Sequence, residues 1–170
     1  TQLYPKRKAI RIYSAPGRTE IGGNHTDHQH GHVLCGSVNL DMLCCAAPNS
    51  ENVIRICSEG YPELTVSLDD LLPREEEQST SAALVRGVAA KMAQMGIALQ
   101  GFDACMTSDV LSGSGLSSSA AFEVLMGTII NAANRHANTR PVIFASFFIA
   151  QLFVVFRDVK IPDRITAFLE

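Results

Sequence analysis

Tryptophan is absent from this sequence of 170 residues, and aromatic residues make up only 6% of it. The longest apolar stretch, residues 142–156, falls short of the roughly 20 residues that a bilayer-spanning helix needs, which argues against a membrane span. The net charge of −3 provides no electrostatic footprint for nucleic acid. Residues 1–11 are basic and polar without an apolar core, so we predict no secretory signal. What remains is the composition of a globular domain, with 46% hydrophobic and 18% charged residues.

The cysteines lack the spacing of a metal or disulfide framework. Their number is odd, and no two of them form a Cys-x-x-Cys pair. This pattern argues against a zinc knuckle and against a set of paired disulfides. We therefore expect buried, reduced thiols in a cytoplasmic protein. The five cysteines are Cys35, Cys44, Cys45, Cys57 and Cys105.

Hydrophobic periodicity predicts strands in the first half of the chain and a mixture of strands and helices after it. Alternating or continuous apolar residues predict strands at 8–14, 33–47, 52–58, 64–68 and 102–110, with 33–47 as one long strand or two paired ones. Residues 15–32 are expected to break the first strand and form a polar loop, and the acidic residues 69–79 to form a connection. Helical spacing of Leu84, Val88, Met92 and Met95 predicts a helix that Gly96 ends, and a second helix begins near Ser117. This order of elements indicates the α+β class.

A loop of glycines and serines stands between the last predicted strand and the second predicted helix. Glycine allows the backbone to turn tightly and to approach a ligand, and the helix start offers free N–H groups to a phosphate. No Gly-Lys-Ser/Thr sequence follows and a third glycine is missing, so the loop is neither a Walker nor a Rossmann motif. The alternative is an ordinary turn that caps the helix; three consecutive serines favour the phosphate site, because one cap needs one serine. The loop comprises Gly113, Ser114, Gly115, Leu116, Ser117, Ser118 and Ser119.

A second cluster of polar residues follows Pro16. Its density of donors and acceptors beside glycines suits a polyhydroxyl ligand, and Asp27 has two oxygens that can accept from sugar hydroxyls. The fixed charge of Arg18 suits the charge that develops on a transferring phosphoryl group. A metal site built from the nearby histidines is a rival interpretation, since alternation on a strand would put three of them on one face, and a solvated loop is another; the histidines are His25, His28, His30 and His32. The cluster contains Arg18, Glu20, Asn24, His25, Thr26, Asp27, His28 and His30.

These two clusters together resemble a known enzyme family. Residues 15–18, 25–27 and 31–34 resemble the galactokinase signature. Residues 113–120 and 122–124 resemble the second motif of the GHMP kinases, which comprise galactokinase and the homoserine, mevalonate and phosphomevalonate kinases. The resemblance extends over residues 9–134. It implies an N-terminal domain with the α+β fold of ribosomal protein S5 domain 2, and it divides the chain into a galactose-binding signature region, 9–48, an ATP-binding region, 49–140, and an atypical apolar tail, 141–170.

The resemblance also implies a role for each matched residue. Asn24, His25, Thr26 and Asp27 would contact galactose or a related sugar, and Gly113 to Ser119 would hold the phosphates of ATP. Ser119 would ligate Mg²⁺, and Arg18 would stabilise the transition state. The family usually has glutamate where this chain has Asn24, and proline where it has Leu111.

The tail departs from the family further. The family's catalytic aspartate has no matching context after residue 134, and its acidic magnesium ligand is missing; Asp163 lies near the expected distance, but its surroundings do not match. We interpret residues 142–156 as a buried helix, with a non-native junction or a membrane segment as alternatives.

The overall expectation is a galactokinase-type phosphotransferase, present as a truncated and inactive N-terminal portion. A non-catalytic sensor of galactose and ATP, or a metal-binding domain based on the histidine-rich loop, is the alternative.

Overall fold

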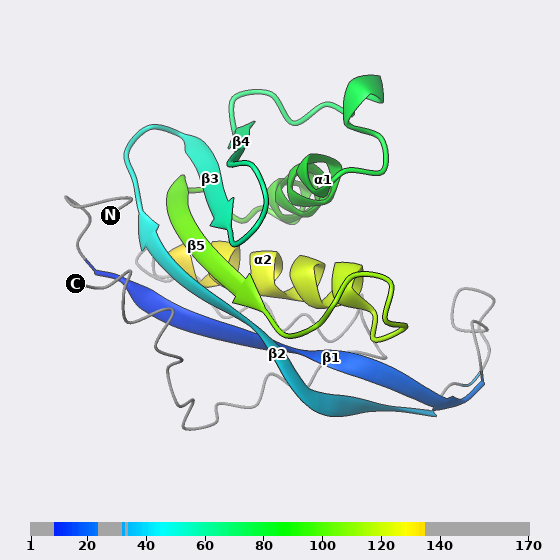
Figure 1. Cartoon of the computed structure of the whole chain (residues 1–170). Coiled ribbons are helices and arrows are strands. Elements are labelled where there is room, and N and C mark those ends of the chain that lie inside the picture. The colour runs from blue at the N-terminus through cyan, green and yellow to red at the C-terminus, as the bar shows by residue number, and fades with distance from the viewer. Residues whose placement is uncertain (1–8, 24–31, 33, 135–170) are drawn as a thin grey trace.

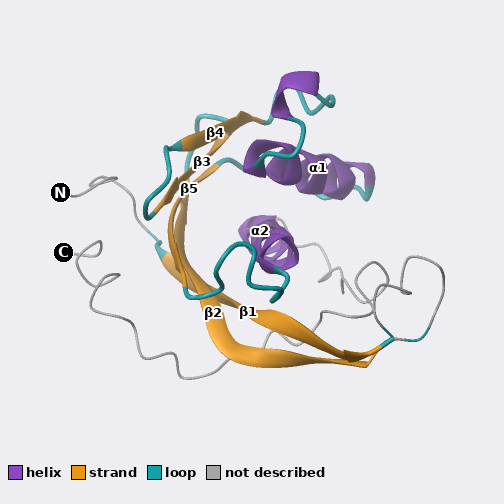
Figure 2. Ribbon diagram, turned by 45° about the vertical axis from the view of Figure 1, so that its right-hand side comes forward, coloured by secondary structure: helices purple, strands orange, loops and turns teal. Residues whose placement is uncertain are grey.

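The computed structural model describes residues 9–23, 32 and 34–134 of the chain. Within them, five strands form one mixed sheet and two helices lie against it (Figure 1). The spatial order of the strands is β1-β2-β5-β3-β4. Figure 2 shows that the sheet curves around α1 and α2, which cover the same face. The described part of the chain therefore has the predicted α+β class.

The first two strands form a long antiparallel ribbon at one edge of the sheet. Strand β1, Arg11–Gly22, pairs with β2, Leu34–Pro48. The prediction that residues 15–18 break the first strand is wrong, since β1 continues through them to Gly22. Proline is tolerated there because β1 is an edge strand, and the register shifts between Pro16 and Arg18. The predicted strand at 33–47 is confirmed as one long strand.

The other three strands complete the sheet on the far side of β2. Strand β5, Phe102–Ser108, pairs antiparallel with β2 and parallel with β3, Val53–Ser58. Strand β4, Leu64–Ser67, pairs antiparallel with β3 at the opposite edge. The short helix η2, Glu75–Glu77, and helix α1, Ser81–Gln94, lie between β4 and β5. Helix α2, Ser118–Asn134, follows β5 after the glycine-serine loop.

Both helices bury an apolar face against the sheet. The predicted positions Phe122, Leu125 and Ile129 of α2 are all buried. In α1 the buried stripe runs through Val85, Ala89 and Met92, and the predicted Met95 is 42% exposed at the helix end. Thr80 caps α1 by accepting a hydrogen bond from the Ala83 N–H group at 3.4 Å. Gly96, with φ at 80°, ends the helix as predicted.

A buried arginine joins the acidic connection to α1. The Nε and Nη2 atoms of Arg86 donate to the two carboxylate oxygens of Glu77, at 2.7 and 2.6 Å, and Nη1 donates to the Asp70 carbonyl. Glu77 of the acidic connection is therefore the partner of a buried charge on α1. Arg86 itself is only 3% exposed, so its charge requires these partners.

The remaining sequence predictions concern thiols and the tail. All five cysteines are free; Cys44 and Cys45 are buried and the other three are partly exposed. Among the described residues, no helix is long and apolar enough to cross a membrane. The tail at 141–170, with Asp163, lies outside the described residues.

Candidate functional site

The side chain of Arg18 on β1 forms an ion pair with Glu20 of the same strand. Its Nη2 atom lies 2.7 Å from Oε1 of Glu20, and each of the two side chains is 16% exposed. Residues i and i+2 of a strand point to the same face, which explains why these two side chains meet. The Nε atom of Arg18 is buried, and nothing in the described part of the chain accepts its hydrogen bond.

The glycine-serine loop connects β5 to α2 in an unusual backbone conformation. Positive φ occurs at every second residue, with 76° at Gly113, 75° at Gly115 and 57° at Ser117. Alternating φ signs turn successive N–H groups toward one side, which is the geometry of an anion-binding nest. Ser117 is not a glycine, so its left-handed conformation indicates local strain at the junction with the helix.

The loop presents free donors at the start of α2. The N–H groups of Gly115, Leu116 and Ser117 donate to no acceptor in the part of the chain that the structure describes. The Ser117 carbonyl accepts the helical bond from Ala121 at 3.0 Å, so α2 begins directly after it. The first turn of α2 contains no acidic residue, and its dipole therefore adds positive potential at the loop.

The two sequence motifs meet at the loop, although nearly the whole described chain separates them. The Arg18 N–H group donates to the Leu116 carbonyl at 3.0 Å. A Cβ atom on Gly17 would lie 3.2 Å from the same carbonyl and 3.1 Å from side-chain atoms of Val38 and Val110. Strand β1 thus passes directly beneath the loop, and Gly17 makes that approach possible.

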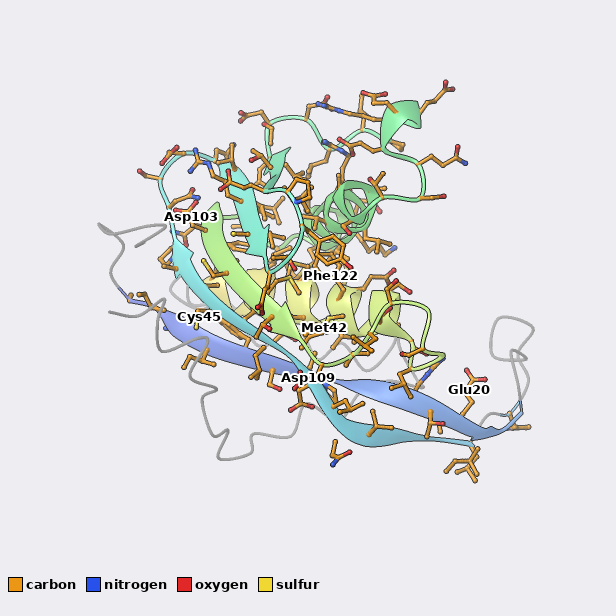
Figure 3. All side chains as sticks on the ribbon, viewed as in Figure 1. Glu20, Met42, Cys45, Asp103, Asp109 and Phe122 are labelled. Carbon is orange, nitrogen blue, oxygen red and sulfur yellow. The ribbon has the colours of Figure 1, made fainter. Side chains whose placement is uncertain are left out.

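Further hydrogen bonds fix the position where the loop leaves the sheet. The Asp109 N–H group donates to the Asp41 carbonyl of β2 at 3.0 Å, and the Val110 N–H group donates to the Ser108 hydroxyl oxygen at 3.1 Å. Figure 3 shows Asp109 just beyond the end of β5, beside the ribbon of β1 and β2. The loop therefore begins from a rigid part of the sheet.

Glu123 is the acidic residue of α2 that lies nearest to the loop in sequence. It is partly buried, and burial raises the pKa of its carboxyl group above the ordinary value. These surroundings therefore favour the neutral form of the carboxyl group over its charged form.

The residues present fit a phosphate group well and a magnesium ion in part. Free loop N–H groups, a helix N-terminus and the unpaired Nε of Arg18 are the donors that phosphate oxygens require. The exposed Ser119 hydroxyl would supply one oxygen to a magnesium ion. Among the described residues, no group of three or more His, Cys, Asp or Glu side chains is placed to hold a metal.

Several predicted site residues lie outside the described residues. They include all four candidate sugar contacts, namely Asn24, His25, Thr26 and Asp27. His28 and His30 of the rival metal site also lie there, whereas His32 is described and exposed. The structure brings Arg18 to the loop of residues 113–119, as a single phosphate-binding region requires. Two residues had no specific role in the sequence interpretation: Glu20, which pairs with Arg18, and Gly17, which allows the close approach.

The chain matches two family descriptions. Residues 1–48 match the galactokinase galactose-binding signature, and residues 83–146 match the N-terminal domain of the GHMP kinases. The galactokinase of Chloroflexus aggregans is 35% identical over 135 residues, which cover 79% of this chain and 34% of that protein. The galactokinase of Bacillus subtilis is 30% identical over 132 residues, which cover 75% of this chain and 33% of that protein.

A solved structure shares the fold. The structure of Lactococcus lactis galactokinase complexed with galactose superposes with a TM-score of 0.70 and 24% identity, covering 81% of this chain and 36% of that chain. The fold and the second motif thus define the N-terminal domain of a GHMP kinase, with the predicted fold. Within that class of phosphotransferases, the chain belongs to the galactokinase family, whose galactose-binding signature it carries. It spans about a third of the length of the curated galactokinases that it matches.

Proposed function

We propose that this chain supplies the sugar- and nucleotide-binding region of an enzyme that transfers the γ-phosphoryl group of ATP to the anomeric hydroxyl of galactose or a close relative. The observation that supports this most directly is the hydrogen bond between the Arg18 N–H group and the Leu116 carbonyl. It joins the galactose-binding signature to the loop of the GHMP kinase domain, so that a sugar and a nucleotide bound to the two motifs would be neighbours.

On this proposal, the loop from Gly113 to Ser119 binds the phosphates through its free N–H groups and the start of α2. Ser119 contributes one oxygen to a magnesium ion that accompanies ATP and neutralises phosphate charge. Arg18 faces the developing charge between the two substrates. Little covalent chemistry is required of the protein in phosphoryl transfer, so these residues act by positioning and by electrostatics.

The sugar side of the proposal rests on the segment between β1 and β2. Asn24, His25, Thr26 and Asp27 follow the end of β1 in sequence, six to nine residues after Arg18. We assign the sugar hydroxyls to these four residues. The free state of all five cysteines supports a cytoplasmic location as part of the same proposal.

Calorimetry with ATP·Mg²⁺ and with galactose, followed by a sensitive phosphoryl-transfer assay, tests the proposal. We expect binding of both ligands, with Arg18→Ala weakening ATP binding roughly tenfold or more, because a hydrogen bond to a charged group contributes about 1.5–3 kcal/mol. Binding of both ligands without turnover agrees with an inactive N-terminal portion, galactose-dependent turnover would show that the chain is active by itself, and binding of neither ligand by the folded chain would refute the proposal.

A further inference from the structure

Two arginines among the residues that the structure describes are largely buried, and each pairs with a glutamate in a different way. The Nε and Nη2 atoms of a guanidinium lie along one edge, and a carboxylate can accept from both. Arg86 uses this edge fully: Nε and Nη2 donate to the two oxygens of Glu77. The pair shows what a complete arginine–glutamate contact looks like in this fold.

The contact between Arg18 and Glu20 uses only half of the same edge. Nη2 donates to Oε1 of Glu20 at 2.7 Å, while the neighbouring Nε is buried without an acceptor in the described residues. A buried donor without a partner is unfavourable, and folded proteins rarely retain one that serves no purpose. The unused Nε–H group therefore points to an acceptor that a ligand supplies.

The backbone positions of both partners are fixed. The Arg18 N–H group is held by the Leu116 carbonyl, and a register shift sets Arg18 apart from Pro16. Glu20 is fixed in the ladder opposite Cys35 of β2. Figure 3 shows the Glu20 side chain rising from the outer part of β1, on the side of the strand that carries the loop in this view. Both partners thus start from fixed points of one strand, two residues apart.

We propose that Glu20 is a positioning residue that holds the Arg18 guanidinium by Nη2 and so keeps its Nε–H group directed to an oxygen of the bound phosphate. This inference rests on the proposed nucleotide site. Glu20 makes no contact with phosphate itself; it limits the rotation of Arg18 and lowers the entropy that binding must remove. The negative charge of Glu20, taken alone, weakens anion binding. Its hydrogen bond to Arg18 strengthens anion binding, so the two effects of Glu20 on affinity oppose each other.

A comparison of Glu20→Gln with Glu20→Ala separates these two effects in the full chain. Both variants remove the charge, but only glutamine keeps an oxygen that accepts from Nη2. The probes are ATP·Mg²⁺ and inorganic tripolyphosphate, titrated by calorimetry. We expect the alanine variant to bind each probe up to about tenfold more weakly than the glutamine variant, because binding must then order an arginine side chain that is no longer held. Equal affinities of the two folded variants would overturn the inference. Glu51→Gln removes a carboxylate from the exposed pair with Arg55 and serves as the matched control that leaves binding unchanged.

Nuclear magnetic resonance of the arginine Nε–H groups tests the same inference without a ligand. In the wild type and in Glu20→Gln, the Arg18 Nε–H signal should be sharp and slow to exchange with water, and in Glu20→Ala it should broaden or vanish. A signal that is unchanged in the alanine variant would contradict the holding role. If the ordered signal depends on Glu20 but neither probe binds the wild type, the proposed nucleotide site fails and the holding role stands by itself. A signal that shifts on addition of tripolyphosphate, and does so less in the alanine variant, would support both.

Discussion

Gly17 lies where β1 passes beneath the glycine-serine loop. A Cβ atom there would meet Val38 and Val110 at 3.1 Å and the Leu116 carbonyl at 3.2 Å. Such contacts are tighter than ordinary packing, so the neighbours would have to move by a few tenths of an ångström.

We predict that Gly17→Ala lowers the free energy of unfolding by about 1–3 kcal/mol, the usual effect of adding a methyl group to a filled site. It should also weaken ATP binding, because the displaced Leu116 carbonyl belongs to the loop. Urea unfolding and calorimetry measure the two effects. Gly36→Ala is the matched control, since a Cβ there meets only Ile21, at 3.8 Å. Equal stability of the two variants would show that β1 and the loop are not in close contact.

Gly115 tests the conformation of the loop itself. Its φ of 75° is unfavourable for any residue with a side chain and worst for a β-branched one, although nothing lies within 4 Å of an added Cβ atom. The cost of a valine therefore comes from its own backbone and not from a clash with neighbours.

We predict that Gly115→Val reduces ATP affinity roughly tenfold or more, because a loop that leaves positive φ no longer directs its N–H groups to one point. Stability should fall by about 1–3 kcal/mol, the usual cost of one strained residue. Gly60→Val carries the same strain, at a φ of 83° in the turn before β4, and should lose stability without losing ATP affinity. Wild-type affinity in a folded Gly115→Val protein would remove the loop from the proposed site.

At the scale of elements, local pattern predicts most of the fold. Alternating apolar residues at 52–58 predict β3 to within one residue, and the change to helical spacing after residue 80 predicts α1. The prediction fails for the end of β1, because proline and glycine at residues 16–17 usually indicate that a strand ends. An edge strand can lack one ladder donor, and only the strand order shows that β1 is at the edge.

Sequence predicts the two motifs of the candidate site separately, but it does not predict that they lie side by side. Residues 113–119 and Arg18 stand out by composition, whereas the hydrogen bond between Arg18 and Leu116 depends on how β1 and the loop pack. The pairs Arg18–Glu20 and Arg86–Glu77 likewise depend on strand faces and on the path of the acidic connection. Sequence alone shows those carboxylates only as charges in polar segments.

Glu123 of helix α2 should make the stability of the fold depend on pH. Burial raises its pKa in the folded protein above the value of about 4.3 that an unfolded chain would have. The stabilising effect of a raised pKa is present below the unfolded value and is lost as the pH rises through the folded value. At neutral pH the helix therefore holds a carboxylate in surroundings that favour the neutral acid.

We predict that Glu123→Gln is more stable than the wild type at pH 7 and equally stable below about pH 4, where both side chains are neutral. Thermal unfolding from pH 3 to pH 8 measures the difference, which should grow as the pH rises through the folded pKa. Glu59→Gln, on the loop after β3, provides a surface comparison. A stability difference that does not change with pH would show that burial of the carboxyl group is not responsible.

At the scale of the whole molecule, one core supports both halves of the site. The main buried cluster contains Ala15 from β1, Met42 from β2 and Phe122 from α2, and Leu116 of the loop packs against it. In Figures 1 and 2 the loop lies where the ribbon of β1 and β2 extends beyond the rest of the sheet. A ligand held between loop and ribbon would therefore favour the folded state of the entire described core.

The last prediction follows from this coupling. A ligand that binds only the folded chain adds RT ln(1 + [L]/Kd) to the free energy of unfolding, or about 2.7 kcal/mol at a hundred times Kd. ATP·Mg²⁺ and galactose should each raise the thermal midpoint of the wild type. Asp27→Ala should abolish the rise with galactose and keep the rise with ATP, because the lost carboxylate belongs to the sugar side. Arg18→Ala should diminish the rise with ATP.

Zinc added alone should leave the midpoint unchanged, and a large rise would instead support the histidine-rich metal site. If Asp27→Ala and Arg18→Ala lower both responses equally, the assignment of sugar to one motif and phosphate to the other is wrong, since damage to a shared core affects both ligands alike.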